Sequence, residues 1–290
     1  MLRTAAVIDV GSNTVRLVTA RFGAAHLDEL HTERVRLGLG HELEATGRLD
    51  EDSIAEAADA VRAYCEEARR QGAHSLEVLV TAPGRQAENG DELVAALTRA
   101  AGYPVRVLTA DEEAELSFAG AVAWAKPEAA VVAVVDLGGA STEIAVGRPE
   151  TGPVWMRSVD LGALRLTTRL RESGGDLDAA RAAVAEAFAG MAPPTPGAAL
   201  IAGGSARALG RVAGRVLGPE ELAEATGVLA ELSPEEITER FEVGRHRAPL
   251  VLAAALIVAE VQQRLLVPLE VTGAGLREGA LLAALDEAAA

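Results

Sequence analysis

The sequence has a single cysteine, fewer basic than acidic residues and no long apolar run. Cys65 cannot form an internal disulfide, which favours a reducing compartment. The 27 Lys and Arg against 43 Asp and Glu give a formal net charge of −16, which argues against binding to duplex nucleic acid, because that binding needs basic side chains. The longest apolar run, Leu250 to Ala259, is too short to span a bilayer, and no secretory signal is recognised. We therefore expect a cytoplasmic protein that binds neither duplex nucleic acid nor a membrane.

Two stretches of the chain resemble one another. Residues 7–14 (Val-Ile-Asp-Val-Gly-Ser-Asn-Thr) and 134–142 (Val-Val-Asp-Leu-Gly-Gly-Ala-Ser-Thr) are each an apolar strand that ends in Asp and continues into a glycine loop. In such a loop the backbone N–H groups can approach phosphate oxygens closely, and the carboxylate can hold a divalent cation. Taken alone, one such loop is better explained as a hairpin turn. Two loops at the same point of a repeated layout favour phosphate and metal binding.

The order of the predicted elements also repeats. In the first half, residue patterns predict strands over 5–10, 14–21, 26–36, 76–80 and 105–109, and helices over 50–70, 91–101 and 111–124, the last capped by Asp111. In the second half they predict strands over 131–135, 142–146, 154–159, 198–202 and 269–272. They predict helices over 176–191, 247–266 and 276–289, and three more helices that begin at residues 203, 219 and 233. The repeat predicts an α/β fold with two related domains across a phosphate-binding cleft.

Three further segments carry candidate site residues. Gly203-Gly204-Ser205 follows a predicted strand and opens a helix, where free N–H groups favour an anion, although a simple strand–helix connection fits as well. The acidic segment 111–115 is typical of a solvated helix start, but a carboxylate near phosphate could deprotonate water. Arg85, in the loop after strand 76–80, and Arg247 are either phosphate contacts or solvated arginines.

As a set, the motifs of this chain resemble those of the exopolyphosphatase/guanosine pentaphosphate phosphohydrolase family, within the actin-like superfamily. The matching segments are 7–17, 36–40 with 46–49, 111–115, 135–143, 160–163 and 275–279. The resemblance implies two duplicated actin-like (ribonuclease H-like) βββαβαβα domains that face a central cleft. They would cover residues 1–119 and 120–290, and the last helix, 276–290, could pack back on the first domain.

The resemblance also implies a role for each matching residue. Glu113 is expected to be the general base, and Glu143 to position water and metal. Asp9, Asp136 and Glu143 are expected to hold Mg²⁺, and Arg16 and Arg247 to face the substrate cleft. The expected phosphate-binding residues are Gly11, Ser12, Asn13, Thr14, Arg85, Gly138, Gly139, Ala140, Ser141, Gly203, Gly204 and Ser205.

These roles predict an enzyme that hydrolyses the terminal phosphoanhydride of polyphosphate and releases orthophosphate. Guanosine pentaphosphate is the closest alternative substrate, so guanosine penta- or tetraphosphate is an alternative ligand. A non-catalytic sensor of either ligand is a second alternative, because Ala140 stands where the family usually has a third glycine and its methyl group would crowd the phosphate. A sugar kinase or ATPase of the superfamily is a third alternative, and family likeness alone suggests a homodimer.

Overall fold

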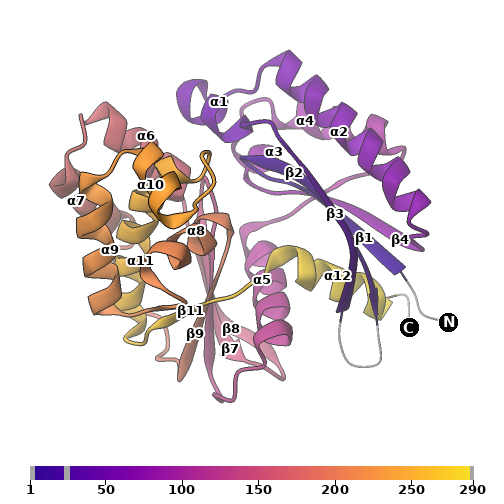
Figure 1. Cartoon of the computed structure of the whole chain (residues 1–290). Helices are drawn as coiled ribbons and strands as arrows, with labels where there is room; N and C mark the ends of the chain where they lie inside the picture. Colours follow the sequence, from indigo (N-terminus) through magenta and orange to yellow (C-terminus); the bar gives the residue numbers. More distant parts are fainter. Residues whose placement is uncertain (1–3, 23–26, 288–290) are drawn as a thin grey trace. The chain divides into compact units, whose positions relative to one another are not determined.

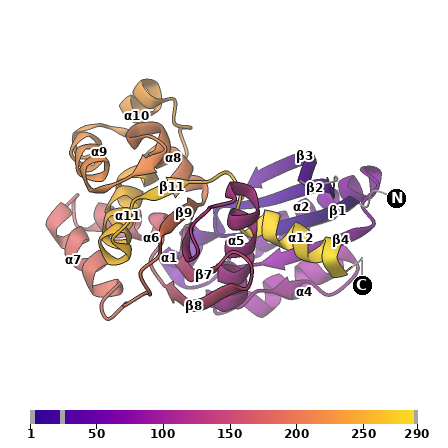
Figure 2. The same cartoon turned by 90° about the horizontal axis from the view of Figure 1, so that it is seen from below.

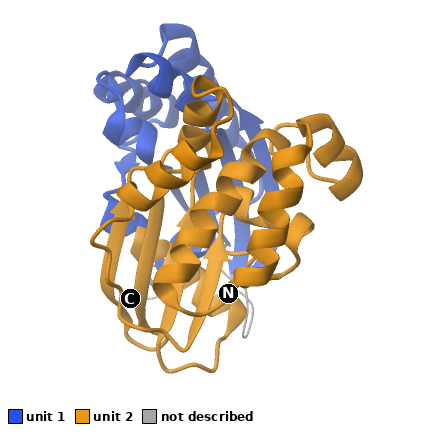
Figure 3. Cartoon of the chain, turned by 90° about the vertical axis from the view of Figure 1, so that its left-hand side faces the viewer, with its two compact units in different colours: residues 1–113, 277–290 blue, residues 114–276 orange. Residues whose placement is uncertain are grey.

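The computed structural model describes residues 4–22 and 27–287 and divides the chain into two compact units (Figures 1 and 3). Unit 1 comprises residues 1–113 and 277–290, and unit 2 comprises residues 114–276. The chain leaves unit 1 inside helix α5 (Ala110–Ala125) and returns to it at helix α12 (Leu276–Glu287). The boundary expected at residue 119 falls further along the same helix. The predicted strand start at His26 and the predicted helix end at Ala289 lie outside the described residues.

Unit 1 is built on a five-stranded sheet in the order β3-β2-β1-β4-β5. Strands β1 (Thr4–Val10), β2 (Thr14–Phe22) and β3 (Leu27–Arg36) are antiparallel, whereas β4 (Ser75–Val80) and β5 (Arg106–Val107) run parallel to β1. Helices α2 (Glu51–Arg70) and α4 (Gly90–Ala101) cover one face of this sheet, and α12 covers the other (Figures 1 and 2). Successive side chains of β1 therefore enter opposite cores.

Alternation along β1 decides which residues meet which helices. Ile8 and Val10 pack in the core beneath α2 and α4, with Val61 of α2 and Leu97 of α4. Val7 is also fully buried, although it lies on the opposite face. Asp9 shares that face, which is the face that α12 covers. A short helix, α1 (Leu39–Thr46), precedes α2, and another, α3 (Ala82–Gln86), follows β4.

Unit 2 repeats this plan around a six-stranded sheet in the order β10-β11-β9-β6-β7-β8. Its strands are β6 (Val132–Leu137), β7 (Thr142–Arg148), β8 (Gly152–Val159), β9 (Ala198–Ala202), β10 (Val216–Leu217) and β11 (Leu269–Val271). β6, β7 and β8 are antiparallel, and β9 runs parallel to β6, as β4 does to β1. The duplicated α/β architecture predicted from the sequence is confirmed, while the central cleft stays a prediction.

The helices of unit 2 lie on both faces of its sheet. Phe118 of α5 packs against Val132 and Val134 on one face. The other face is covered by α6 (Ala163–Glu172), α7 (Leu177–Ala187), α8 (Gly204–Ala213), α9 (Pro219–Glu231) and α11 (Val251–Leu265), with α10 (Pro234–Phe241) and the 3₁₀ turn Ala248–Leu250 beside them. The segment Ala248–Leu265 has the length and apolar composition of a membrane span, but 67% of it is buried inside the protein, as expected of a core helix.

Several predicted elements differ from the observed ones. Residues 82–86 form helix α3 instead of a loop, and α1, α6 and β10 were not predicted. α1, α3 and β10 are too short to give a clear apolar period, whereas α6 has one, with buried Leu164, Leu166 and Leu170, that the prediction missed. Asp111 is not the cap of α5. The hydroxyl of Thr109 accepts the N–H of Glu112 (3.2 Å) and the Glu112 carboxylate accepts the N–H of Thr109 (2.8 Å), so Thr109 and Glu112 form a capping box.

Candidate functional site

The first glycine loop is fixed by backbone hydrogen bonds. The N–H of Gly11 donates to the carbonyl of Thr14 (3.0 Å), which closes the turn between β1 and β2. The carbonyl of Ser12 accepts from Gly40 (2.6 Å), and that of Asn13 accepts from Leu37 (3.3 Å). The start of α1 therefore anchors the carbonyl side of the loop, so the loop is held in one conformation before any ligand binds.

The second loop repeats the same turn. The N–H of Gly138 donates to the carbonyl of Ser141 (3.0 Å). The carbonyls of Gly138 and Gly139 accept N–H groups from the first turn of α6, at 3.0 Å from Ala163 and 2.9 Å from Leu164. Gly162 makes this contact possible, since a Cβ there would lie 2.4 Å from the carbonyl carbon and oxygen of Gly139. The two predicted loops thus share one backbone geometry, and each is supported by a following helix.

Equivalent positions beside the loops carry different charges. In the strand register Asp9 lies opposite Arg16, which lies opposite Arg34. Asp136 likewise lies opposite Glu143, and Glu143 opposite Ser158. Paired residues of antiparallel strands project from the same face. We call Asp9, Arg16 and Arg34 the basic row of unit 1, because two bases lie beside the aspartate. We call Asp136, Glu143 and Ser158 the acidic row of unit 2, because a second acid lies beside the aspartate.

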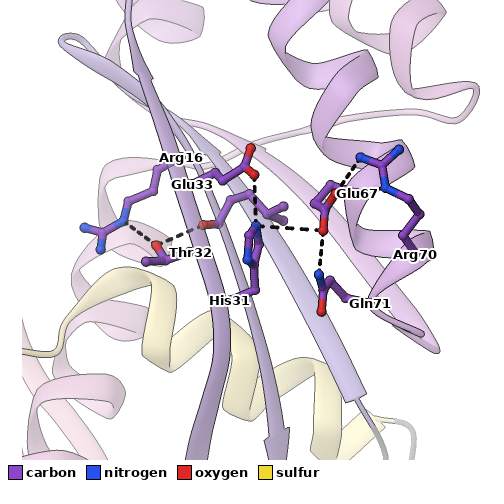
Figure 4. Close-up of polar contacts among 8 residues, drawn as sticks. Arg16, His31, Thr32, Glu33, Glu67, Arg70 and Gln71 are labelled. Atoms are coloured by element: carbon purple, nitrogen blue, oxygen red, sulfur yellow. Dashed lines mark hydrogen bonds and ion pairs between the residues drawn. The ribbon is translucent and has the colours of Figure 1, made fainter.

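The side chains of these rows are held by specific partners. The Nε of Arg16 donates to the Thr32 hydroxyl across β2 and β3 (3.2 Å), as Figure 4 shows, so Arg16 lies along the sheet. The Ser158 hydroxyl donates to Oε1 of Glu143 (2.8 Å), and only 1% of Glu143 is exposed. Glu143 therefore lies beneath the protein surface, next to the strand end that carries Asp136.

Each loop aspartate is also held by a side chain from a distant helix. The Nη1 of Arg277, at the start of α12, donates to Oδ2 of Asp9 (3.0 Å). The Ser117 hydroxyl, on α5, makes a short hydrogen bond to Oδ2 of Asp136. Arg277 and Ser117 were not among the predicted site residues. Two hints in the sequence indicate that these residues belong to the site. Arg277 lies in the family-like segment 275–279, and Ser117 lies one helical turn after Glu113.

The predicted base and the predicted phosphate contact of unit 1 lie together. The Nη1 of Arg85 lies 2.9 Å from Oε2 of Glu113 and donates to the carbonyl of Leu108 (2.7 Å). The exposed fractions of the two side chains are 19% for Arg85 and 12% for Glu113. Arg85 belongs to α3 instead of a loop, and α3 fixes the direction of its side chain towards the start of α5.

The three adjacent acids at the start of α5 therefore have different roles. Asp111 is exposed. Glu112 caps the helix and pairs with Arg106 (2.7 Å), and these contacts, led by the Thr109 N–H, lower the pKa of Glu112 to about 2. Glu113 alone turns towards Arg85. The role of Glu113 as general base stays a prediction.

The start of helix α8, in unit 2, lies beside an arginine, Arg247. Gly203 has a φ of 109°, and a Cβ on it would lie 2.4 Å from the carbonyl oxygen of Leu137. The guanidinium of Arg247 lies against Gly204, where a Cβ would be 2.5 Å from its Nη2, and its Nη1 lies 3.4 Å from the Ser205 hydroxyl. A helix N-terminus and an arginine at one place favour an anionic ligand.

The structure also bears on Ala140 and on the metal. Ala140 is 1% exposed and is as buried as Ser141 and Glu143 of the same segment, so its methyl group is packed inside the protein. The described residues contain no cluster of three or more His, Cys, Asp or Glu able to hold a metal. Mg²⁺ commonly binds through one or two carboxylates, water and substrate phosphates, and the acidic row of Asp136 and Glu143 fits that donor set.

Comparisons with known proteins place these features in a family. Residues 18–288 match the sequence profile of the Ppx/GppA phosphatase family. A region of 181 residues is 38% identical to exopolyphosphatase 2 of Mycobacterium tuberculosis and covers 59% of this chain. It covers 56% of that relative, so the matched region spans little more than half of the relative's length. A region of 184 residues, covering 63% of this chain, is 28% identical to 36% of the guanosine-5'-triphosphate,3'-diphosphate pyrophosphatase of Aeromonas salmonicida. The crystal structure of the Ppx/GppA family member of Aquifex aeolicus matches with a TM-score of 0.85, 25% identity and 99% coverage of both chains.

Proposed function

This chain belongs to the Ppx/GppA phosphatase family, and from that premise we propose that it is a Mg²⁺-dependent exopolyphosphatase. The proposed reaction is hydrolysis of the terminal phosphoanhydride of inorganic polyphosphate, with release of orthophosphate. The name of the mycobacterial relative supports this substrate. The duplicated glycine loops support a phosphate ligand, because each presents a fixed turn at the end of a strand.

The observation that carries the proposal is the pairing of Arg85 with Glu113 at 2.9 Å. A phosphate that draws the guanidinium of Arg85 away from Glu113 would lie beside the freed Glu113 carboxylate, which is where a general base for phosphoryl transfer to water is needed. The flanking acids have other surroundings, since Glu112 caps α5 and Asp111 is exposed. We therefore assign the role of general base to Glu113.

The proposed step follows from these positions. Glu113 accepts a proton from water while the water oxygen attacks the terminal phosphorus. The bond from that phosphorus to the bridging oxygen breaks, and the shortened chain leaves with the electron pair. Within unit 1, backbone N–H groups of the first glycine loop and the side chain of Arg85 would stabilise charge on the transferred phosphoryl oxygens. Mg²⁺, if bound, would supply further positive charge to phosphate oxygens, and Asp136 and Glu143 of unit 2 are the residues that we propose would hold it.

The test is orthophosphate release from polyphosphate, guanosine pentaphosphate and ATP, each measured with Mg²⁺ and with EDTA. The proposal predicts Mg²⁺-dependent release from polyphosphate. Faster release from guanosine pentaphosphate would favour the second candidate substrate, which the name of the Aeromonas relative supports. ATP-only turnover would point to a kinase-like or ATPase activity instead.

Binding of polyphosphate without turnover would indicate a sensor. The main sequence argument for a sensor is that the methyl group of Ala140 would crowd the phosphate. The cytoplasmic location and the homodimer stay predictions.

A further inference from the structure

The two loop aspartates occupy equivalent places in the duplicated fold. Asp9 ends β1 on the sheet face that α12 covers, and Asp136 lies at the end of β6 on the face that α5 covers. Each aspartate lies opposite the residue seven positions later, Arg16 in one case and Glu143 in the other. Each also receives a hydrogen bond from its covering helix, so the two sites can be compared directly.

The partners from the covering helices differ in charge. Asp136 receives a neutral hydroxyl from Ser117, whereas Asp9 receives the guanidinium of Arg277 at 3.0 Å. The exposed fractions are 14% for the Asp9 side chain and 18% for that of Arg277, so the ion pair is largely shielded from water. A shielded, charge-assisted hydrogen bond of this length is stronger than an exposed pair.

A divalent ion at Asp9 would have to compete with this guanidinium. The cross-strand neighbour of Asp9 is a base, Arg16, whereas that of Asp136 is a second carboxylate, Glu143. A base beside the carboxylate adds positive charge, which disfavours a cation at Asp9. The acidic row of unit 2 therefore suits a divalent cation, and the basic row of unit 1 suits phosphate oxygens.

We propose that Arg277 is a positioning residue that neutralises and orients Asp9, so that the first loop receives phosphate oxygens while Asp9 is committed to Arg277 instead of Mg²⁺. An unneutralised Asp9 carboxylate would repel a polyanion at this loop. This inference rests on the proposed phosphate-binding function. It revises the expectation that Asp9 is a metal ligand, and it gives a role to the segment 275–279, which the proposed mechanism leaves unused.

The first test measures the apparent affinity for polyphosphate in a charge-removal cycle. Arg277→Gln leaves Asp9 unneutralised and is expected to weaken the affinity about tenfold. The double variant Asp9→Asn/Arg277→Gln removes both charges and is expected to recover to within about threefold of wild type. Arg277→Lys, which keeps the charge, is expected to lie between Arg277→Gln and wild type. A double variant no better than Arg277→Gln would overturn the proposal.

The control is Arg264→Gln in unit 2. Arg264, on α11, pairs with Glu260 at 2.7 Å with similarly low exposure, 26% and 16%, and belongs to neither loop. Its loss is expected to lower the melting temperature but leave the affinity for polyphosphate unchanged. A similar loss of affinity in this control would show that Arg277→Gln acts through stability alone, which would also overturn the proposal.

The second test measures Mn²⁺ binding by electron paramagnetic resonance with polyphosphate present. Asp9→Asn is expected to stay within about twofold of wild type, and Asp136→Asn to weaken Mn²⁺ binding at least tenfold. Equal losses in the two variants would overturn the inference. If the wild-type protein fails to hydrolyse polyphosphate, the proposed function is wrong. The role of Arg277 can still be decided in that case, by measuring the affinity for polyphosphate of the same set of variants by calorimetry.

Discussion

At the scale of the residue, neighbours decide what each acid at the start of α5 does. Glu112 receives the N–H of Thr109 and pairs with Arg106, while Glu113, one position later, meets Arg85. A helix rotates successive side chains by about 100°, so adjacent acids point in different directions. The difference in role is thus set by the helix and by what surrounds it, because the two side chains are chemically identical.

The capping acid should give the protein a measurable acid dependence. The pKa of Glu112 in the folded state is about 2, below its ordinary 4.5, so its ionised form stabilises the fold. That contribution is complete above about pH 4.5 and is lost as the pH falls towards 2. Glu112→Gln keeps a capping acceptor but has no charge. We expect it to be less stable than wild type by up to about 1 kcal/mol at pH 7.

Urea unfolding at a series of pH values measures this difference. The gap in free energy of unfolding between wild type and Glu112→Gln should close between about pH 4.5 and pH 2. Glu115→Gln, an exposed acid of the same helix, is the control and should show no such closing gap. A constant gap down to pH 2 would contradict the assigned capping role.

At the scale of the element, each glycine loop depends on the segment that packs behind it. The second loop is supported by the N-terminus of α6, and Gly162 allows their backbones to touch. The first loop uses the start of α1 in the same way. The loops are therefore shaped by tertiary contacts, not only by their own glycines.

Gly162→Ala tests this dependence. Its methyl group would lie 2.4 Å from the backbone of Gly139, so the second loop must move. We expect a loss of about 1–3 kcal/mol in the free energy of unfolding, together with reduced phosphate release. Gly227→Ala is the matched control, since Gly227 lies inside α9 with no atom within 4 Å of the new Cβ. It should stabilise the protein by about 0.5–1 kcal/mol. Equal destabilisation by both variants would contradict the account.

Sequence patterns could predict the long elements but not the short ones. The β-branched run of β6 and the apolar period of α2 each reflect burial that the residues themselves display. Helix α3 contains Pro83 and Gly84, which usually form turns, and it packs against α4 and α1, contacts that its own residues do not reveal. The site was predictable where it repeats a motif, as at Asp9 and Asp136. The partner of Asp9 was not, because Arg277 is 268 residues away and only the fold brings the two together.

At the scale of the whole molecule, the chain builds two compact units and crosses between them twice. One core gathers α2 and α4 beneath the first sheet, and the other gathers α6 to α9 and α11 beneath the second. Helix α12, at the end of the chain, belongs to unit 1 and buries Leu281 and Ala284. Unit 1 is therefore completed by a segment that follows the whole of unit 2 in the sequence.

Truncation after Leu276 tests this completion. Loss of α12 uncovers one face of the first sheet and removes Arg277, so unit 1 should lose stability while unit 2 keeps it. Hydrogen exchange read by mass spectrometry should show faster exchange in peptides from β1 and β2, and unchanged protection in β6 and α11. If the truncated chain aggregates, Leu281→Ala should show the same pattern at a cost of about 2–5 kcal/mol. Equal loss of protection in both units would contradict the division.

The most direct test of the proposed function compares two adjacent, isosteric variants. Orthophosphate release from polyphosphate with Mg²⁺ is measured for wild type, Glu113→Gln and Glu112→Gln. We expect Glu113→Gln to lose at least about a hundredfold in rate, because the base that accepts the water proton is gone. Glu112→Gln should keep most of the rate, since it removes only a charge at the helix cap. Equal rates for the two variants, or turnover by Glu113→Gln at the level of wild type, would contradict the account.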